Sequence, residues 1–210
     1  MTTQTRSAVD SIDKTSWVFR PVLLLKPLVF LLCLAPLVLM VTALLTDRLG
    51  ANPIESLSHE TGQWALRLLL IGLLATPLQQ QFRWLWTVRI RRMIGLFAFF
   101  YASLHMLVFI WLDQQWDWPL IAGEILEKPY LLAGVLGLLL LLPLALTSSN
   151  SMMRKLGRRW KSLHRWVYIA VLAGCVHFVW LAKGDKPEPL VYLSIFLGLL
   201  IWRFARLVKK

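Results

Sequence analysis

Residues 158–177 read RRWKSLHRWVYIAVLAGCVH, and this stretch predicts both the fold and the chemistry of the chain. It begins as a basic segment and continues as an apolar run of the kind that enters a membrane as a helix. It carries two of the four histidines, His164 where the helix would enter the bilayer and His177 well inside it. Because an ionisable side chain inside a membrane is costly, an intramembrane histidine is by default a functional-site hypothesis.

The composition is that of a membrane protein. Of the 210 residues, 58% are hydrophobic, 16% are charged and 11 are tryptophan, whereas a soluble domain carries about 25% charged residues. The apolar residues fall in blocks long enough to cross a bilayer, so the sequence predicts an all-α integral membrane protein. No hydrophilic stretch is long enough for a soluble domain, and any nucleotide-binding or catalytic module must therefore be another protein.

The net charge of +12 and the two cysteines each exclude a class of function. The basic residues fall in short segments between apolar blocks, which is typical of membrane orientation, so we expect membrane lipid and no nucleic acid among the partners. Cys33 and Cys175 lie inside apolar runs, and the chain has no CxxC motif. That excludes covalent c-type haem attachment and zinc sites of the usual spacing.

Six apolar blocks predict a six-helix membrane domain at about 21–206, between a cytoplasmic N-terminal segment, 1–20, and a cytoplasmic tail, 207–210. The expected spans are 21–45, 62–78, 93–112, 130–147, 163–181 and 190–204. Segments rich in lysine and arginine alternate with acidic or neutral ones, which predicts that both termini are cytoplasmic. The second span is expected to end at Thr76-Pro77, and the sequence shows no internal repeat.

Two histidines are expected at one height in the membrane. His105 lies 13 residues after Arg92, and His177 lies 13 residues after His164, on spans that both run outward from the cytoplasm. Both are therefore about 20 Å from the cytoplasmic boundary. Two imidazoles at one level of a four-helix core can bind one haem iron from both sides, and the alternative is a pair of histidines that form hydrogen bonds within the bundle. Small residues nearby leave room for a macrocycle: Ala102, Ser103, Ala173 and Gly174.

His164 is the ambiguous histidine, about 20 Å below His177 on the same helix. The position at its depth on the third span is Arg91 or Arg92, and its ring is about 140° out of phase with that of His177. A second haem would therefore need an unusual ligand opposite His164. The alternative is an interfacial histidine that meets lipid headgroups or the headgroup of a flavin or quinol.

Two further side chains on the outer side, and one basic segment, have open roles. Arg67 is expected near the height of His105 and His177, where a buried arginine needs an anion such as a haem propionate or a carboxylate; the alternative is snorkelling to the outer surface. His59 is expected in the loop before the second span as a solvated histidine. The basic segment 154–165 serves topology and lipid contact, or else a flavin phosphate or a quinone.

The order and spacing of several short blocks resemble those of a known family. The blocks are His59-Glu60-Thr61-Gly62, Thr76-Pro77-Leu78, Arg91-Arg92-Met93-Ile94-Gly95-Leu96, Leu104-His105, Lys128-Pro129-Tyr130-Leu131, Ala145-Leu146-Thr147-Ser148, Arg154-Lys155-Leu156-Gly157-Arg158-Arg159-Trp160, Leu163-His164 and His177-Phe178-Val179-Trp180. They look like the MsrQ family, the haem-binding membrane subunits of bacterial periplasmic methionine-sulfoxide reductase systems, within the wider ferric-reductase-like transmembrane group. The resemblance covers nearly the whole chain.

The resemblance implies a multi-pass protein of the bacterial inner membrane that binds haem b and also uses FMN. It implies a non-catalytic electron-transfer subunit that takes electrons from the quinone pool. The electrons pass to a periplasmic molybdopterin-containing partner, which reduces methionine sulfoxide in damaged periplasmic proteins. The family's histidines map onto His105, His164 and His177. Unlike two-haem ferric reductases, this chain lacks the second histidine on the third span and a soluble flavin domain, so a cytoplasmic flavin reductase is an alternative donor.

Two other classes of function remain open at this stage. The histidines could serve as the relay of a proton-coupled transporter, but the small size, the absence of intramembrane Asp or Glu and the lack of repeats weigh against it. The chain could also be a simple membrane anchor for a soluble enzyme, which would leave the histidines unexplained.

Overall fold

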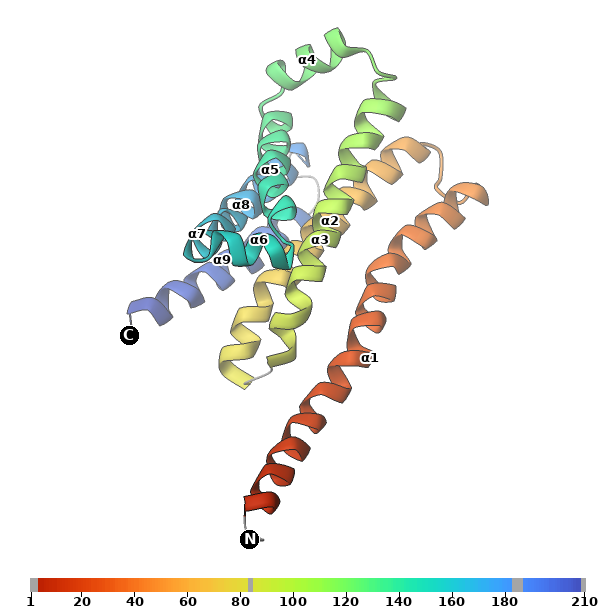
Figure 1. The fold of residues 1–210 in the computed structure, drawn as a ribbon. Helices are drawn as coiled ribbons and strands as arrows, with labels where there is room; N and C mark the ends of the chain where they lie inside the picture. Colours follow the sequence, from red (N-terminus) through yellow and green to blue (C-terminus); the bar gives the residue numbers. More distant parts are fainter. Residues whose placement is uncertain (1–3, 83–84, 183–186, 209–210) are drawn as a thin grey trace. The chain divides into compact units, whose positions relative to one another are not determined.

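The computed structural model describes residues 4–82, 85–182 and 187–208, and within these ranges every regular element is a helix. The elements in chain order are α1 (Gln4–Leu45), α2 (Pro53–Phe82), α3 (Leu85–Leu107), η1 (Val108–Asp113), α4 (Trp118–Glu127), α5 (Pro129–Leu146), α6 (Asn150–Leu156), α7 (Arg158–Leu163), η2 (His164–Trp166), α8 (Val167–Leu181) and α9 (Glu188–Val208) (Figure 1). By its internal contacts the chain divides into two units, Met1–Leu39 and Met40–Lys210. The second unit holds all four histidines.

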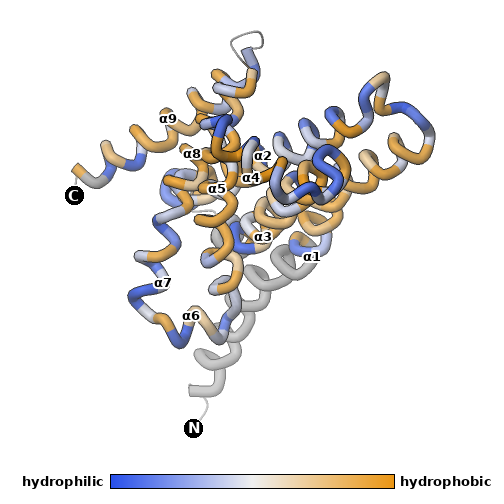
Figure 2. Tube along the Cα trace, turned by 90° about the horizontal axis from the view of Figure 1, so that it is seen from above, coloured by the Kyte–Doolittle hydropathy of each residue, from blue (hydrophilic) through white to orange (hydrophobic). Residues whose placement is uncertain are grey.

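Six helical stretches are long and apolar enough to cross a membrane, which confirms the predicted all-α membrane class. They are Leu25–Leu45, Pro53–Phe82, Ile90–Asp113, Pro129–Leu146, Arg158–Leu181 and Glu188–Arg206. Figure 2 shows hydrophobic residues along most of the length of α5, α8 and α9. Many of these side chains are exposed large hydrophobics, such as Leu139, Ile169 and Ile201. A surface of this kind is expected to face lipid.

Two antiparallel hairpins, α2 with α3 and α5 with α8, form the core of the second unit. The hairpins contact each other through α3 with α5 and α2 with α8, and α9 packs against α2 and α8. A Cβ added at Gly137 of α5 would lie 3.5 Å from the Ala170 carbonyl oxygen and 3.6 Å from the Ala173 Cβ of α8. These are ordinary van der Waals distances, so the two helices are in direct contact through small residues, as in other membrane bundles. Ala173 and Gly174 serve this packing, since Gly174 faces Leu66 of α2.

The second span is longer than predicted at both ends. α2 begins at Pro53 and continues through Pro77 to Phe82, so the expectation that it ends at Thr76-Pro77 is wrong. A membrane helix tolerates proline when neighbouring side chains bond the backbone around it. Two residues before Pro77, the buried Thr87 hydroxyl of α3 donates to the Ala75 carbonyl at 3.1 Å and joins the two helices there.

The segments between the spans contain short helices. On the expected inner side, α6 and α7 meet at Gly157, whose φ of +51° lies in a region that favours glycine. On the expected outer side, α4 is capped by the Asp117 side chain, which accepts a hydrogen bond from the Leu120 amide. The segment expected as an acidic outer loop is therefore largely helical.

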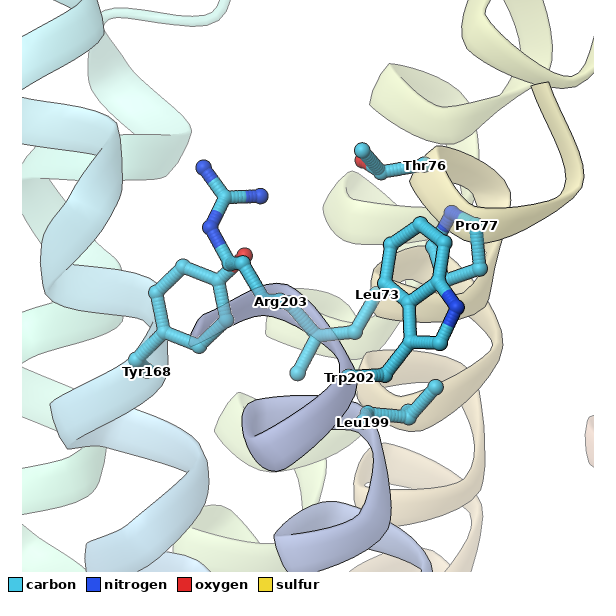
Figure 3. A pocket seen from close by; sticks show the side chains of 7 residues that line it. All are labelled: Leu73, Thr76, Pro77, Tyr168, Leu199, Trp202 and Arg203. Atoms are coloured by element: carbon cyan, nitrogen blue, oxygen red, sulfur yellow. The ribbon is translucent and has the colours of Figure 1, made fainter. Parts of the chain in front are cut away.

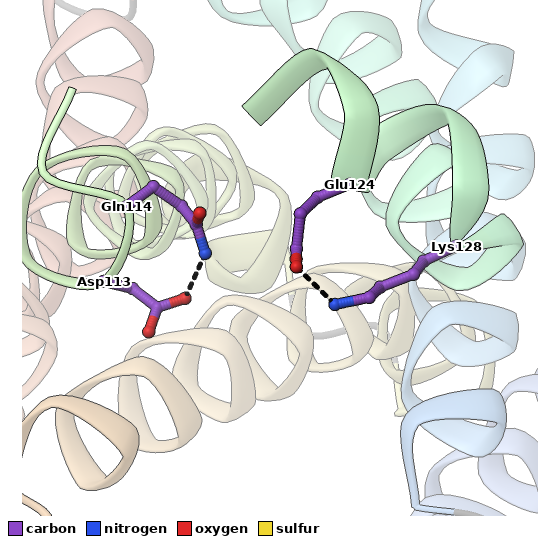
Figure 4. A network of polar contacts seen from close by, with 4 residues as sticks. All are labelled: Asp113, Gln114, Glu124 and Lys128. Atoms are coloured by element: carbon purple, nitrogen blue, oxygen red, sulfur yellow. Dashed lines mark hydrogen bonds and ion pairs between the residues drawn. The ribbon is translucent and has the colours of Figure 1, made fainter. Parts of the chain in front are cut away.

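The end of α4 carries an ion pair, which Figure 4 shows beside a second polar contact. The Lys128 Nζ lies 2.6 Å from the Glu124 Oε1, one helical turn away. The hydrogen bond to Glu124 raises the pKa of Lys128 above its ordinary value. Nearby, Gln114 Nε2 donates to Asp113 Oδ2 at 3.0 Å. These contacts fix the ends of the connection between α3 and α5.

Candidate functional site

His105 and His177 come together between the two hairpins. His105 lies on α3 and His177 on α8, and their ring centroids are 6.0 Å apart with the ring planes at 75°. The expectation of a common height is confirmed, because the two imidazoles are direct neighbours. They come from separate hairpins, so the tertiary fold of the second unit is what pairs them.

Each of the two rings is oriented by a backbone carbonyl. His105 Nδ1 lies 2.8 Å from the Ser58 carbonyl oxygen of α2, and His177 Nδ1 lies 2.7 Å from the Tyr130 carbonyl oxygen of α5. A carbonyl only accepts hydrogen bonds, so Nδ1 must carry the proton in both rings. A neutral imidazole then presents a lone pair at Nε2. This arrangement is the one that orients metal-binding histidines in other proteins.

Each ring also packs against a glycine of the neighbouring helix. A Cβ added at Gly62 would lie 3.2 Å from His105 Nδ1 and Cε1, and one added at Gly134 would lie 3.0 Å from His177 Nδ1. Distances this short require the ring to move. The two glycines therefore provide the space in which the rings reach their carbonyl acceptors, a role that the sequence analysis did not assign to either of them.

The two hairpins repeat one arrangement, so the expectation that the chain has no internal repeat is wrong. In both hairpins the histidine lies 47 residues after the residue whose carbonyl it contacts. In both, the glycine lies one helical turn after that carbonyl, as Ser58 precedes Gly62 and Tyr130 precedes Gly134. The residues between differ, with HET in one hairpin and LLA in the other, which hides the repeat. The detectable signal was a glycine and a histidine at one fixed separation in each half.

The residues at this site fit a metal held inside a macrocycle. Two imidazoles on opposite sides of one metal ion, each with a metal–nitrogen distance of about 2.0–2.1 Å, have ring centroids about 6 Å apart. The observed separation is 6.0 Å. In the described part of the chain, no group of three or more His, Cys, Asp or Glu side chains could hold a metal ion. Two axial nitrogens are sufficient only when other atoms fill the equatorial positions, as in haem.

His59 belongs to the same region, which corrects its expected place in a solvated loop. It lies on α2 and is half-buried, because the helix begins earlier than the apolar pattern indicated. Its ring meets Phe178 of α8 edge to face, with centroids 5.6 Å apart. Its Nε2 is 3.1 Å from Gln63 Nε2, the amide nitrogen one turn along the same helix.

Arg67 lies one further turn along α2, in a polar network that reaches α9. It donates from Nε to the Tyr192 hydroxyl at 2.8 Å and from Nη2 to Gln63 Oε1, and its guanidinium stacks 5.0 Å from the Trp64 ring. Gln63 Nε2 in turn donates to Glu188 Oε2 at 3.0 Å. The partners that Arg67 contacts are neutral. Of the two anions expected from sequence, a haem propionate or a carboxylate, the described residues show a carboxylate, that of Glu188, linked to Arg67 through Gln63.

His164 stands apart from the other three histidines. Its ring stacks on Trp160 with centroids 3.9 Å apart, and its Nδ1 lies 3.1 Å from the Trp160 carbonyl oxygen. Arg91 lies within electrostatic range of it, while Arg92 turns away to the Asn150 side chain. All four histidines are described, and the other three lie at the opposite level. His164 therefore has no imidazole opposite it.

Comparisons with known proteins identify relatives over most of the chain. Residues 61–175 match the family of the ferric reductase like transmembrane component. Proteins named protein-methionine-sulfoxide reductase heme-binding subunit MsrQ are similar at 43% identity in Azospira oryzae, over 88% of this chain and 80% of the relative. The same name is carried by relatives in Rhodospirillum rubrum, 47% identical over 82% of this chain and 83% of the relative, and in Caulobacter vibrioides, 43% identical over 84% of each. No solved structure matches the chain.

Proposed function

The chain belongs to the MsrQ family of haem-binding subunits, within the ferric-reductase-like transmembrane family, and we propose its function from this membership and from the geometry of the site. It is a multi-pass membrane protein with a role in electron transfer. Its specific task, in our proposal, is to carry electrons across the bacterial inner membrane through one haem b bound between His105 and His177.

The observation that carries this proposal is the paired orientation of the two rings. Both Nδ1 atoms face carbonyl oxygens at 2.7–2.8 Å, so each neutral ring keeps an unprotonated Nε2 that can bind a metal. Haem, when bound, supplies a one-electron carrier whose potential depends on axial ligands and on nearby charge. The chain's own residues fix the tautomer of each histidine and restrict rotation of each ring. A histidine relay for proton transport is disfavoured, because the partner of each Nδ1 is a backbone carbonyl, which accepts a hydrogen bond but cannot pass a proton on.

The proposed direction of transfer follows from the charge of the connecting segments. The basic connections face the cytoplasm by the positive-inside rule, which puts His105 and His177 nearer the periplasm. Electrons enter from the quinone pool, or from a cytoplasmic flavin reductase, with FMN as a further cofactor. They leave to a periplasmic molybdopterin-containing methionine-sulfoxide reductase subunit, so that the complex repairs oxidised periplasmic proteins. The name that the relatives carry, heme-binding subunit of a protein-methionine-sulfoxide reductase, supports a reductase partner.

A spectrum of the purified protein tests the proposal. In detergent, the reduced-minus-oxidised difference is expected to show b-type bands, and extracted haem is expected to equal one per chain. His164 lacks an imidazole partner, so a second bis-histidine haem is not expected. A preparation with full helical content but no b-type bands would contradict the proposed function.

Arg67 is proposed to stabilise the haem electrostatically, with a propionate as its counter-ion. Its contacts in the described part of the chain are neutral, so its charge is available to an anionic group. Arg67→Met is expected to lower the haem midpoint potential by about 30–60 mV, because loss of a positive charge favours the oxidised iron. A shift of about 59 mV corresponds to a tenfold change in a one-electron equilibrium. Redox titration measures it. Arg67→Lys retains the charge and is expected to retain most of the potential; equal shifts in both variants would contradict the role of charge.

A further inference from the structure

Gln63 is a buried polar side chain of α2, next in the chain to Gly62, which packs against the ring of a proposed haem ligand. Only 7% of its surface is exposed. Its Oε1 accepts a hydrogen bond from Arg67 Nη2, and its Nε2 lies 3.0 Å from Glu188 Oε2 and 3.1 Å from His59 Nε2. The amide therefore lies at the centre of the polar network that joins α2 to α9.

The partners of Gln63 fix the orientation of its amide. A guanidinium only donates hydrogen bonds and a carboxylate only accepts them, so the amide oxygen must face Arg67 and the amide nitrogen must face Glu188. The second N–H of the amide is left for His59 Nε2, which must accept it. The oxygen and both N–H groups are thus used, and turning the amide over would lose the contacts with both charged groups.

Helices α2 and α9 are parallel and in register, which fixes the height of Glu188 relative to Arg67. Four pairs of residues, one from each helix, are separated by 125 positions. They are Gln63 with Glu188, Arg67 with Tyr192, Pro77 with Trp202 and Gln81 with Arg206. Three of the pairs are hydrogen-bonded, and Pro77 and Trp202 border one small hollow (Figure 3). Glu188 is consequently one helical turn from Tyr192, the residue level with Arg67.

The Gln63 amide stands between a cation and an anion. Arg67 contacts its oxygen and Glu188 contacts its nitrogen, and in the part of the chain that the structure describes no ion pair joins Arg67 to Glu188. Arg67 is half-buried, whereas Glu188 is exposed. A long arginine side chain can move its charge toward water, and opposite charges attract strongly in a partly buried place. Without the amide, Arg67 is expected to turn outward and pair with Glu188.

A direct pair would remove the charge of Arg67 from the haem and neutralise it. We infer that Gln63 is a positioning residue, whose amide keeps Arg67 apart from Glu188 so that the charge of Arg67 acts on the haem. The inference rests on the proposed function, in which Arg67 stabilises the haem. Helix α9 carries no histidine, yet through Glu188 and Tyr192 it takes part in setting the haem potential.

Redox titration of the full-length protein in detergent tests the inference. Gln63→Leu removes the amide and is expected to lower the haem midpoint potential by about a threefold change in the one-electron equilibrium, or about 28 mV, and by no more than Arg67→Met does. In a Glu188→Gln background the same substitution is expected to leave the potential unchanged, because Arg67 then has no carboxylate to pair with. An equal fall in both backgrounds, or no fall in Gln63→Leu, would overturn the inference.

Gln81→Leu is the control for the attachment of α9. Gln81 Oε1 accepts from Arg206 Nη2 at 2.8 Å, so this substitution also removes a glutamine–arginine contact between α2 and α9, about five helical turns from Gln63. The potential of the wild type is expected. A fall as large as that of Gln63→Leu would assign the effect to helix attachment and overturn the inference.

A second variant covers the case in which Gln63→Leu does not keep its haem. Gln63→Asn retains the amide on a side chain one methylene shorter, which cannot reach Arg67 and Glu188 together. It is expected to lower the potential in the same direction as Gln63→Leu. The potential of the wild type in Gln63→Asn would then count against the inference.

The free energy of unfolding separates failure here from failure of the proposed role of Arg67. It is measured for Arg67→Met, Glu188→Gln and the double variant, in the wild type and again in Gln63→Leu. The coupling between Arg67 and Glu188 is expected to be at least about threefold larger, as a factor in the unfolding equilibrium, when the amide is absent. Equal coupling in both backgrounds would overturn the inference. Larger coupling with an unchanged potential in Arg67→Met would support the separation by Gln63 and contradict the action of Arg67 on the haem.

Discussion

Replacement of His105 or His177 by alanine is expected to abolish haem binding, and either substitution alone is expected to be sufficient. The proposed haem would be held by both imidazoles, and a single remaining imidazole would hold it with much lower affinity. The purified variants are expected to lack the b-type bands and to contain less than about a tenth of the wild-type haem. Haem extracted per chain, in detergent, is the measurement.

His164→Ala is the control for these two substitutions, because it removes an imidazole from η2, just before α8, at the opposite level of the bundle. His164 stacks on Trp160 and lacks an imidazole opposite it, so its loss is expected to leave the haem content unchanged. Full haem in either His105→Ala or His177→Ala would disprove the proposed pair. Complete loss in His164→Ala would mean that the ligands had been assigned to the wrong level.

Gly134→Ala is expected to have the second largest effect, although it adds one methyl group. The new Cβ would lie 3.0 Å from His177 Nδ1, and the backbone of α5 cannot yield without disturbing its close contact with α8 at Gly137. The ring must therefore shift by a few tenths of an ångström, which disturbs its hydrogen bond to the Tyr130 carbonyl and the position of Nε2. We expect haem occupancy to fall at least severalfold, and Gly134→Val to empty the site. Visible and electron paramagnetic resonance spectra report both changes.

Gly62→Ala is expected to act in the same way on His105 but less severely, since its Cβ would lie 3.2 Å from that ring. Gly95→Ala and Gly198→Ala are matched controls, because a Cβ at either position meets nothing within 4 Å. Alanine favours a helix over glycine by about 0.8–1.0 kcal/mol, so the controls are expected to keep their haem and to be at least as stable. Equal haem content in Gly134→Ala and Gly95→Ala would refute the proposed role of the glycines.

Because the two hairpins share one arrangement, the substitutions at His105 and Gly62 in one hairpin have counterparts at His177 and Gly134 in the other. Each half presents one histidine, one carbonyl acceptor and one glycine, and neither half can bind an iron from both sides alone. The outer level keeps this symmetry, whereas at the inner level Arg92 of one half corresponds to His164 of the other. The inner level therefore has one imidazole, that of His164, with no second imidazole opposite it.

The sequence by itself determined the class of the protein, the number of its spans and the level of its histidines. These properties depend on position along a helix axis, where each residue adds about 1.5 Å, so counting from the basic boundary put His105 and His177 together. The boundaries of α2 could not be predicted from the sequence, because the polar turns around His59 and beyond Pro77 do not continue the apolar pattern and yet are helical in the packed bundle.

Only the tertiary structure decided which groups face each other across helices. The Ser58 and Tyr130 carbonyls, the two glycines beside the rings, and the contact of Arg67 with Tyr192 all join residues far apart in the chain. Such contacts depend on the rotation of each helix about its axis and on the closeness of its neighbours. Those are set by the interlocking of many side chains across the bundle, and the apolar pattern of a membrane helix, hydrophobic on nearly every face, does not encode them.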